Sequence, residues 1–155
     1  MNEIEQLIRN YLPNVIHMSL GTCVDSKPWV CEVHYAYDGD LNIYFFSLPS
    51  TRHCQEIAQN PLVSGNIVIP HGLGEKPQGV YFEGRAEKLD DSQEVDNALQ
   101  IYGERFKERV EFAKQELPKE DGWRFYKITV LDFYVFDVRG ELNPPGKHRL
   151  PWKKS

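Results

Sequence analysis

Four side chains suited to anion binding lie close together between residues 47 and 53. Ser47 and Thr51 carry hydroxyl groups, Arg52 carries a permanent positive charge, and His53 carries an imidazole that protonates near neutral pH. Ser50 or Thr51 can cap a short helix, whose start presents unpaired backbone N–H groups and a partial positive charge. A phosphate there would gain several hydrogen bonds at once, so the stretch predicts a phosphate site. In the alternative interpretation the hydroxyls only cap the helix and the cationic side chains point into water.

A strand and a short helix must position these groups. Residues 41–47 alternate between two faces and are rich in aromatic and β-branched side chains, which is typical of a covered strand. Pro49 ends this strand, and a helix is predicted from Arg52 to Gln59. Asn60 and Pro61 stop the helix.

The rest of the chain is predicted to form mostly strands. They are expected at residues 15–24, 29–37, 62–69, 79–89 and 123–138, the last with a bend near residues 131–132, and helices are expected at residues 3–11, 91–102 and 104–117. The Asp38-Gly39 pair predicts a hairpin turn in which Gly39 takes a positive φ. Six strands with few helices predict a mainly β (α+β) fold, an antiparallel barrel that closes to hide its edges.

Size, charge and hydropathy narrow the class of protein. With 155 residues, a single domain over residues 1–155 is expected. The net charge of −5 argues against nucleic acid as a partner. No stretch is apolar for long enough to span a membrane, and the first ten residues lack the features of a secretory signal, so a cytoplasmic protein without a membrane partner is expected. Cys23, Cys31 and Cys54 are odd in number and widely spaced, and are expected to be buried small apolar residues.

Three motifs stand in a fixed order along the chain: the hairpin PWVCEVHYAYDGDLNIYFFS, the helix and strand STRHCQEIAQNPLVS, and the strand GVYFEGRAEKL. In this order they resemble the pyridoxamine 5′-phosphate oxidase-like family, the FMN-binding split barrels, whose S-R-K helix and G-x-A-E-x-L strand the last two match. The likeness covers residues 15–90 well and the rest loosely. It implies a six-stranded antiparallel split β-barrel with a few flanking helices, and a homodimer that binds FMN.

The resemblance also implies which residues bind the cofactor. In this family the flavin phosphate lies at the start of the short helix, which matches Ser47, Thr51 and Arg52, with His53 in the place of the family's lysine. The flavin ring lies against a strand that corresponds here to Trp29, Val30, Cys31, Glu32, Val33 and His34. Gly79 or Gln78 stands near the position of a flavin-contacting glutamine. Trp29 and His34 replace basic residues of the family pattern, so oxidation of pyridoxamine phosphate itself is not expected.

The leading functional prediction is an FMN-dependent oxidoreductase that acts on an unidentified small substrate. The flavin would carry the hydride, and no catalytic side chain and no metal site are predicted. The alternatives are a non-enzymatic flavin or haem binder or sensor, a deazaflavin-dependent reductase, and a degenerate barrel that binds no cofactor and serves as a dimeric interaction module. A haem binder needs an axial ligand, for which His17, His34 and His148 are the candidates.

The tail ELNPPGKHRLPWKKS combines cationic side chains with an aromatic one, including Lys147, His148, Arg149 and Trp152. One hypothesis is that this tail folds over the cofactor of the partner subunit and selects an anionic substrate. The alternative is a disordered end.

Overall fold

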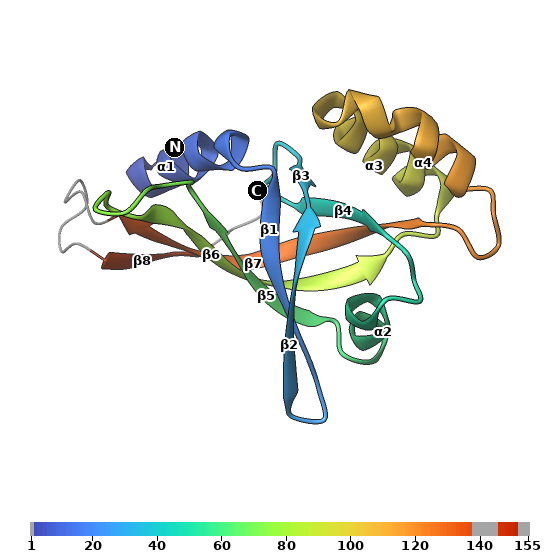
Figure 1. Ribbon diagram of the computed structural model, residues 1–155, viewed down its shortest axis with the longest axis horizontal. Coiled ribbons are helices and arrows are strands. Elements are labelled where there is room, and N and C mark those ends of the chain that lie inside the picture. The colour runs from blue at the N-terminus through green and yellow to red at the C-terminus, as the bar shows by residue number, and fades with distance from the viewer. Residues whose placement is uncertain (1, 138–145, 152–155) are drawn as a thin grey trace.

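The computed structural model describes residues 2–137 and 146–151, and its elements are labelled in Figure 1. In chain order the helices and strands are α1 (Glu3–Tyr11), the 3-10 turn η1 (Leu12–Asn14), β1 (His17–Val24), β2 (Lys27–His34), β3 (Ala36–Tyr37), β4 (Ile43–Ser47), α2 (Arg52–Gln59), β5 (Leu62–Val68), β6 (Gln78–Lys88), α3 (Ser92–Arg105), η2 (Lys107–Arg109), α4 (Val110–Glu116), β7 (Arg124–Asp137) and β8 (Gly146–Pro151).

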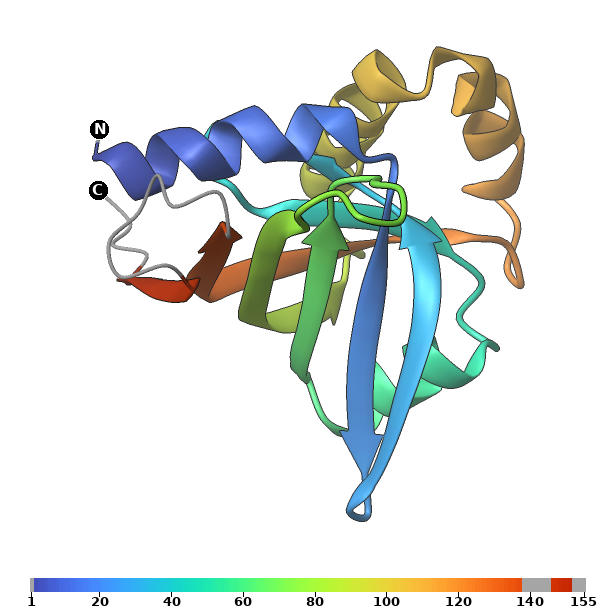
Figure 2. The same cartoon turned by 60° about the vertical axis from the view of Figure 1, so that its left-hand side comes forward.

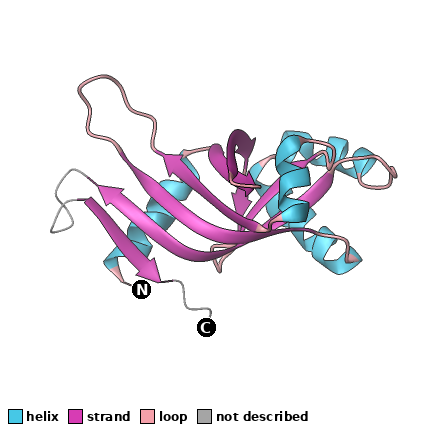
Figure 3. Cartoon of the chain, turned by 90° about the horizontal axis from the view of Figure 1, so that it is seen from below, coloured by secondary structure: helices cyan, strands magenta, loops and turns pink. Residues whose placement is uncertain are grey.

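The strands form one curled antiparallel sheet, which confirms the predicted fold class (Figure 3). The order across the sheet is β2-β1-β5-β6-β7-β4-β3, and β8 pairs with β7. Eight strands are present in the described residues instead of the six predicted, because residues 29–37 divide into β2 and β3, and because β8 lies in the tail. Since β2 and β3 stand at opposite ends of the strand order, the barrel is split between them.

The division of the second predicted strand occurs at Tyr35, which is fully buried. The Tyr35 hydroxyl donates a hydrogen bond to the Leu12 carbonyl at 2.7 Å, and its backbone N–H donates to the Ile16 carbonyl at 3.3 Å. These two bonds hold the chain against the end of the N-terminal helical segment. β2 therefore remains paired with β1, whereas β3 continues into a hairpin with β4.

The hairpin predicted around Asp38-Gly39 is confirmed, but the predicted role of Gly39 is wrong. Ala36 pairs with Tyr44 across the hairpin, and the residue with a positive φ is Leu41, at 61°. The Asp38 carboxylate accepts hydrogen bonds from the backbone N–H groups of Asp40 and Asn42, so it shapes the turn in place of the glycine.

Helices α3 and α4 cover one end of the sheet and make a second, aromatic core there (Figure 2). Phe46 of β4 and Phe125 of β7 lie 4.5 Å apart between ring centroids, and Tyr102 of α3 packs against both. The main core fills the inside of the curled sheet, with α1 packed on it. The second core fixes the helices α3 and α4 beside the end of β4.

The bend predicted in the last long strand is present as a β-bulge. The register between β6 and β7 shifts at Glu83 and Gly84, so that Leu131 has no partner across the ladder. None of the helices in the described residues is long and apolar enough to cross a membrane. In the tail, only the backbone pairing of β8 with β7 is defined. Residues 138–145 and 152–155, including Trp152, lie outside the described residues, so the hypothesis about the tail stays a prediction.

Candidate functional site

The start of α2 follows β4 after a short turn, as the sequence predicts. Thr51 is the N-cap residue, but its hydroxyl donates to the Leu48 carbonyl at 2.8 Å and makes no capping hydrogen bond. Within the described residues, the N-cap side chain therefore leaves the first backbone N–H groups of the helix without a capping hydrogen bond. The helix start remains open to an anion from outside the chain.

Ser47 and His53 meet beside this open helix start. The Oγ atom of Ser47 lies 2.9 Å from Nε2 of His53, and the Oγ1 atom of Thr51 lies 3.4 Å from the same nitrogen. His53 is only 9 % exposed, and this burial lowers the pKa of its imidazole. The imidazole is therefore neutral at neutral pH, unless a bound anion compensates its charge.

Arg52 points away from the Ser47 hydroxyl. Its Nε donates to Oε2 of Glu56 at 3.2 Å, and its guanidinium carbon lies 4.1 Å from the ring centroid of Trp29. The Glu56 carboxylate is buried, and its Oε2 also accepts a 3.5 Å hydrogen bond from Thr22. The predicted site residues thus form two groups, one around His53 and one around Arg52.

A cavity of about 440 Å³ joins the first group to the end of β2. Its walls contain five of the predicted cofactor-binding residues together with residues from β1, β4, α3 and η2 and the residue just before β7. The full set is His17, Glu32, Val33, His34, Phe46, Ser47, His53, Tyr102, Arg109 and Trp123. The end of the strand predicted to face a flavin ring therefore shares one space with Ser47 and His53, two of the four residues predicted to hold its phosphate.

The cavity holds a set of charged and titratable side chains. Nη1 of Arg109 donates to Nδ1 of His34 at 3.3 Å, and partial burial together with this guanidinium lowers the pKa of His34. Nδ1 of His17 lies 2.7 Å from Oε2 of Glu32, and the Ser19 hydroxyl donates to the other carboxylate oxygen. The one carboxylate of the cavity wall is thus occupied by neighbours on β1.

Sequence reasoning missed Arg109 and the aromatic residues Tyr102 and Trp123. They come from a segment predicted only as helices and a strand, which follows α2 in the sequence after β5 and β6. No local motif marks them. Only the aromatic spacing that packs α3 on the sheet could have indicated that this segment approaches β4.

The other predicted site residues lie elsewhere on the same sheet. Trp29 and Val30 line a separate hollow of about 590 Å³ that extends over β5 and β6, and Cys31 is half-buried. Gly79 pairs with Val68 and Phe136, where a Cβ atom would lie 2.4 Å from the Ile67 carbonyl oxygen. The structure does not bring Gly79 to either hollow.

Gln78 and the cysteines are also held within the fold. The side-chain amide of Gln78 donates to the Tyr11 hydroxyl at 3.1 Å, which ties β6 to α1. Cys54 is buried, and Cys23 and Cys31 are half-buried, all three as free thiols. Burial raises the pKa of Cys31 to about 11, so this thiol is protonated at neutral pH.

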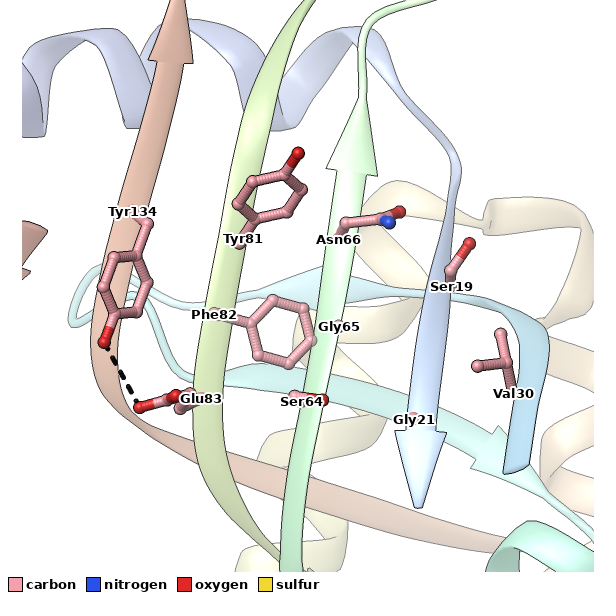
Figure 4. A pocket seen from close by; sticks show the side chains of 10 residues that line it. All are labelled: Ser19, Gly21, Val30, Ser64, Gly65, Asn66, Tyr81, Phe82, Glu83 and Tyr134. Atoms are coloured by element: carbon pink, nitrogen blue, oxygen red, sulfur yellow. Dashed lines mark hydrogen bonds between the residues drawn. The ribbon is translucent and has the colours of Figure 1, made fainter. Parts of the chain in front are cut away.

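A third hollow, of about 560 Å³, lies on the outer face of β1, β5, β6 and β7 (Figure 4). Gly21 and Gly65 are part of its lining, and the absence of a side chain at Gly65 makes room for the ring of Phe82. The Tyr134 hydroxyl donates to Oε2 of Glu83 at 3.4 Å on one side of the hollow. Val30 lines this hollow and the neighbouring one around Trp29, so the two form one continuous concave face.

Comparisons with known proteins agree with the fold. The family model described as pyridoxamine 5′-phosphate oxidase matches residues 4–135. No curated protein sequence matches the chain significantly.

Solved structures with the same fold have low sequence identity to this chain. A heme-binding protein from Mycobacterium smegmatis is similar with a TM-score of 0.77 and 16 % identity, over 97 % of this chain and 59 % of that one. A FAD-binding protein from Mesorhizobium loti has a TM-score of 0.62 and 23 % identity, and the match covers 86 % of this chain and 90 % of that one. HutZ, the heme storage protein from Vibrio cholerae, has a TM-score of 0.65 and 18 % identity, and the match covers 81 % of this chain and 86 % of that one. At these identities the likeness establishes the fold alone.

Proposed function

The chain belongs to the pyridoxamine 5′-phosphate oxidase family, and we propose that it binds FMN beside the start of α2 and acts as an oxidoreductase on a small substrate. One observation carries the proposal. The open helix start, Ser47 and His53 share a cavity of about 440 Å³ with Glu32, Val33 and His34 of β2. A phosphate group and a ring system attached to it would find their predicted surroundings in a single space.

The phosphate would bind at the start of α2. The first backbone N–H groups of this helix lack a side-chain cap, and the hydroxyls of Ser47 and Thr51 lie next to them. Hydrogen bonds to a charged phosphate contribute more than neutral ones, about 1.5–3 kcal/mol each. His53 would take up a proton when the phosphate approaches, because an adjacent anion favours the charged imidazole.

The flavin ring would lie along β2. β2 is the first strand in the order across the sheet, so in the described part of the sheet the edge of β2 opposite β1 has no neighbouring strand. The unpaired N–H and C=O groups of that edge suit the alternating donors and acceptors of a flavin ring. When bound, FMN supplies the hydride chemistry at its ring, and the chain orients the ring and excludes water.

A homodimer would cover the apolar face next to this strand. Trp29, Val30, Leu62 and Leu131 are 39–62 % exposed and line one hollow. A group of large exposed apolar residues of this kind favours an interface, and a two-fold symmetric dimer is the commonest form. Replacing Val30 by Asp should therefore shift the protein from dimer to monomer in light scattering after gel filtration. A monomeric wild-type protein, or a V30D dimer of undiminished stability, would contradict this proposal.

The absorption spectrum of the purified protein and the mass of its extracted cofactor test the proposed function. Flavin maxima and the mass of FMN are expected. The protein without cofactor is then titrated with FMN, and Ser47→Ala should raise the Kd about 10- to 100-fold, since it removes a hydrogen bond to the phosphate. Ser92→Ala, at the exposed start of α3, serves as the control. A protein that shows no chromophore even with added FMN would refute the proposal.

Haem binding is the second candidate, because two of the three candidate axial ligands, His17 and His34, line the same cavity. Two of the similar structures are described as heme-binding and heme storage proteins. A Soret band instead of flavin maxima would favour haem, and His34→Ala should then alter that band. A deazaflavin cofactor would be recognised by its extracted mass.

A further inference from the structure

We propose that Arg109 is the permanent cation of the phosphate site and that it makes the cavity select a phosphorylated flavin over one without phosphate. This inference rests on the proposed function and adds a residue from outside the three sequence motifs. It assigns to the segment between α3 and α4 a role in ligand choice.

The charges of the cavity wall lead to this assignment. His53 stands where the family has lysine, and its burial keeps the imidazole neutral in the absence of an anion. The side chain of Arg52 pairs with Glu56 and lies over Trp29, and it does not line the cavity. Among the side chains that line the cavity, Arg109 is the one whose charge does not depend on pH.

The bonds of Arg109 leave its charge available. Its described hydrogen bond goes to the neutral Nδ1 of His34, and its guanidinium carbon lies 5.9 Å from the ring centroid of Phe112. Within the described part of the chain, no carboxylate lies within ion-pair distance of it. Arg9 and Arg52, in contrast, each pair with a glutamate one helical turn away. A phosphate would thus supply the anionic partner that Arg109 lacks.

The fold holds Arg109 in place from both sides. Phe106, three residues earlier, stacks on the ring of His34 with centroids 5.3 Å apart and an interplanar angle of 23°. The same Phe106 packs against Tyr102, whose ring contacts Phe46 and Phe125 in the second core. On the other side, Phe112 of α4 contacts Phe46 and Trp123. Arg109 is therefore positioned over the cavity before any ligand arrives, which lowers the entropy cost of binding.

The position of Arg109 explains how the site functions without the family's lysine. The lost charge at residue 53 is replaced from a different element, across the cavity from the helix start. A guanidinium can also donate two hydrogen bonds to one phosphate, which an ammonium group cannot do in the same fixed geometry.

The test compares FMN with riboflavin, which differ by the phosphate alone. Kd values for both are measured by flavin fluorescence for the wild type, Arg109→Ala and Lys107→Ala. Lys107 is an exposed cation two residues away, and it controls for the net charge. Arg109→Ala should weaken FMN binding about 10- to 100-fold and change riboflavin binding less than about threefold. Lys107→Ala should bind both ligands like the wild type.

Each outcome is decisive. If Arg109→Ala weakens both ligands equally, or neither, Arg109 does not contact the phosphate, although the proposed FMN site stands. If the wild type binds neither ligand, the proposed function fails and this inference fails with it. Arg109→Gln, which retains the length and polarity of the side chain, answers the same question if the alanine variant does not fold, and Arg109→Lys should recover part of the selectivity for FMN.

Discussion

Replacing His53 by glutamine should weaken FMN binding at pH 6 and leave it unchanged at pH 8.5. In the free protein the buried imidazole, 2.9 Å from the Ser47 hydroxyl, has a pKa lowered by desolvation. A phosphate at the start of α2 would raise this pKa, so FMN binding is coupled to the uptake of one proton. FMN affinity therefore rises as the pH falls towards the pKa of His53 in the complex.

The expected magnitude follows from the change in one hydrogen bond. A hydrogen bond to a charged group contributes about 1.5–3 kcal/mol and a neutral one about 0.5–1.5 kcal/mol, so the positive charge on His53 adds about 1–1.5 kcal/mol. This corresponds to a Kd about 5- to 12-fold higher for H53Q than for the wild type at pH 6. The phosphate itself takes up a proton near pH 6, as in phosphorylated side chains. This second effect acts on both proteins and cancels in the ratio of their Kd values.

Fluorescence titrations of both proteins with FMN at pH 6, 7 and 8.5 give this ratio directly. Calorimetry in two buffers with different heats of ionisation counts the protons taken up. His71→Gln is the matched control, since His71 is an exposed histidine bonded to the Ile69 carbonyl, outside the cavity. A ratio that stays constant across the pH range, or is largest at pH 8.5, would refute the reasoning that His53 becomes charged on binding.

Three further predictions concern stability. Burial lowers the pKa of His53 in the folded state, so the unfolded chain binds the proton more tightly. The free energy of unfolding of the cofactor-free protein should therefore fall as the pH drops below about 6.5. Thermal melts between pH 7.5 and 5.5 test this, and a rise in stability towards pH 5.5 would contradict it. Arg52→Ala removes the cation beside the buried Glu56 and should lower the free energy of unfolding in urea by about 1–2 kcal/mol, less than for a fully buried pair because Arg52 is half exposed. The double variant Arg52→Ala/Glu56→Gln should recover part of that loss, and an equal loss in the single and double variants would contradict the prediction. A Cβ atom at Gly65 would lie 2.4 Å from a ring carbon of the neighbouring strand β6, so Gly65→Ala should cost about 1–3 kcal/mol, whereas Gly39→Ala, with open space around it, should be nearly neutral in the same melts.

Local sequence signals predicted the elements that frame the site. The helix after β4 runs from Arg52 to Gln59 as expected, because a proline and a cap residue precede it and Asn60-Pro61 follows it. The bend near residues 131–132 was also predicted, since the alternation of apolar residues changes phase there. The helix depends on residues close in the sequence, and the bend, although it is a bulge in the pairing of β7 with β6, is marked by the local pattern of apolar residues.

Features that depend on distant contacts were not predicted. The break at Tyr35 arises from hydrogen bonds to Leu12 and Ile16, which no pattern around residue 35 indicates. Arg109 approaches His34 only because the aromatic core under α3 and α4 forms. The Arg52 side chain was expected beside the phosphate, but a glutamate one turn later and the Trp29 ring across the sheet hold it in this structure. Side-chain contacts with other segments, together with the Arg52–Glu56 ion pair on α2, decide these placements, and local propensity does not.

The place of β7 in the sheet has a consequence for biosynthesis. β7 pairs with β6 on one side and with β4 on the other. The pairing of Ile43 with Ile128 can therefore form only after Ile128 has left the ribosome. Until then the nascent chain has two strands, β4 and β6, with bare edges that invite pairing with other chains. A slow step in translating residues 92–123 should therefore increase aggregation of the newly made chain.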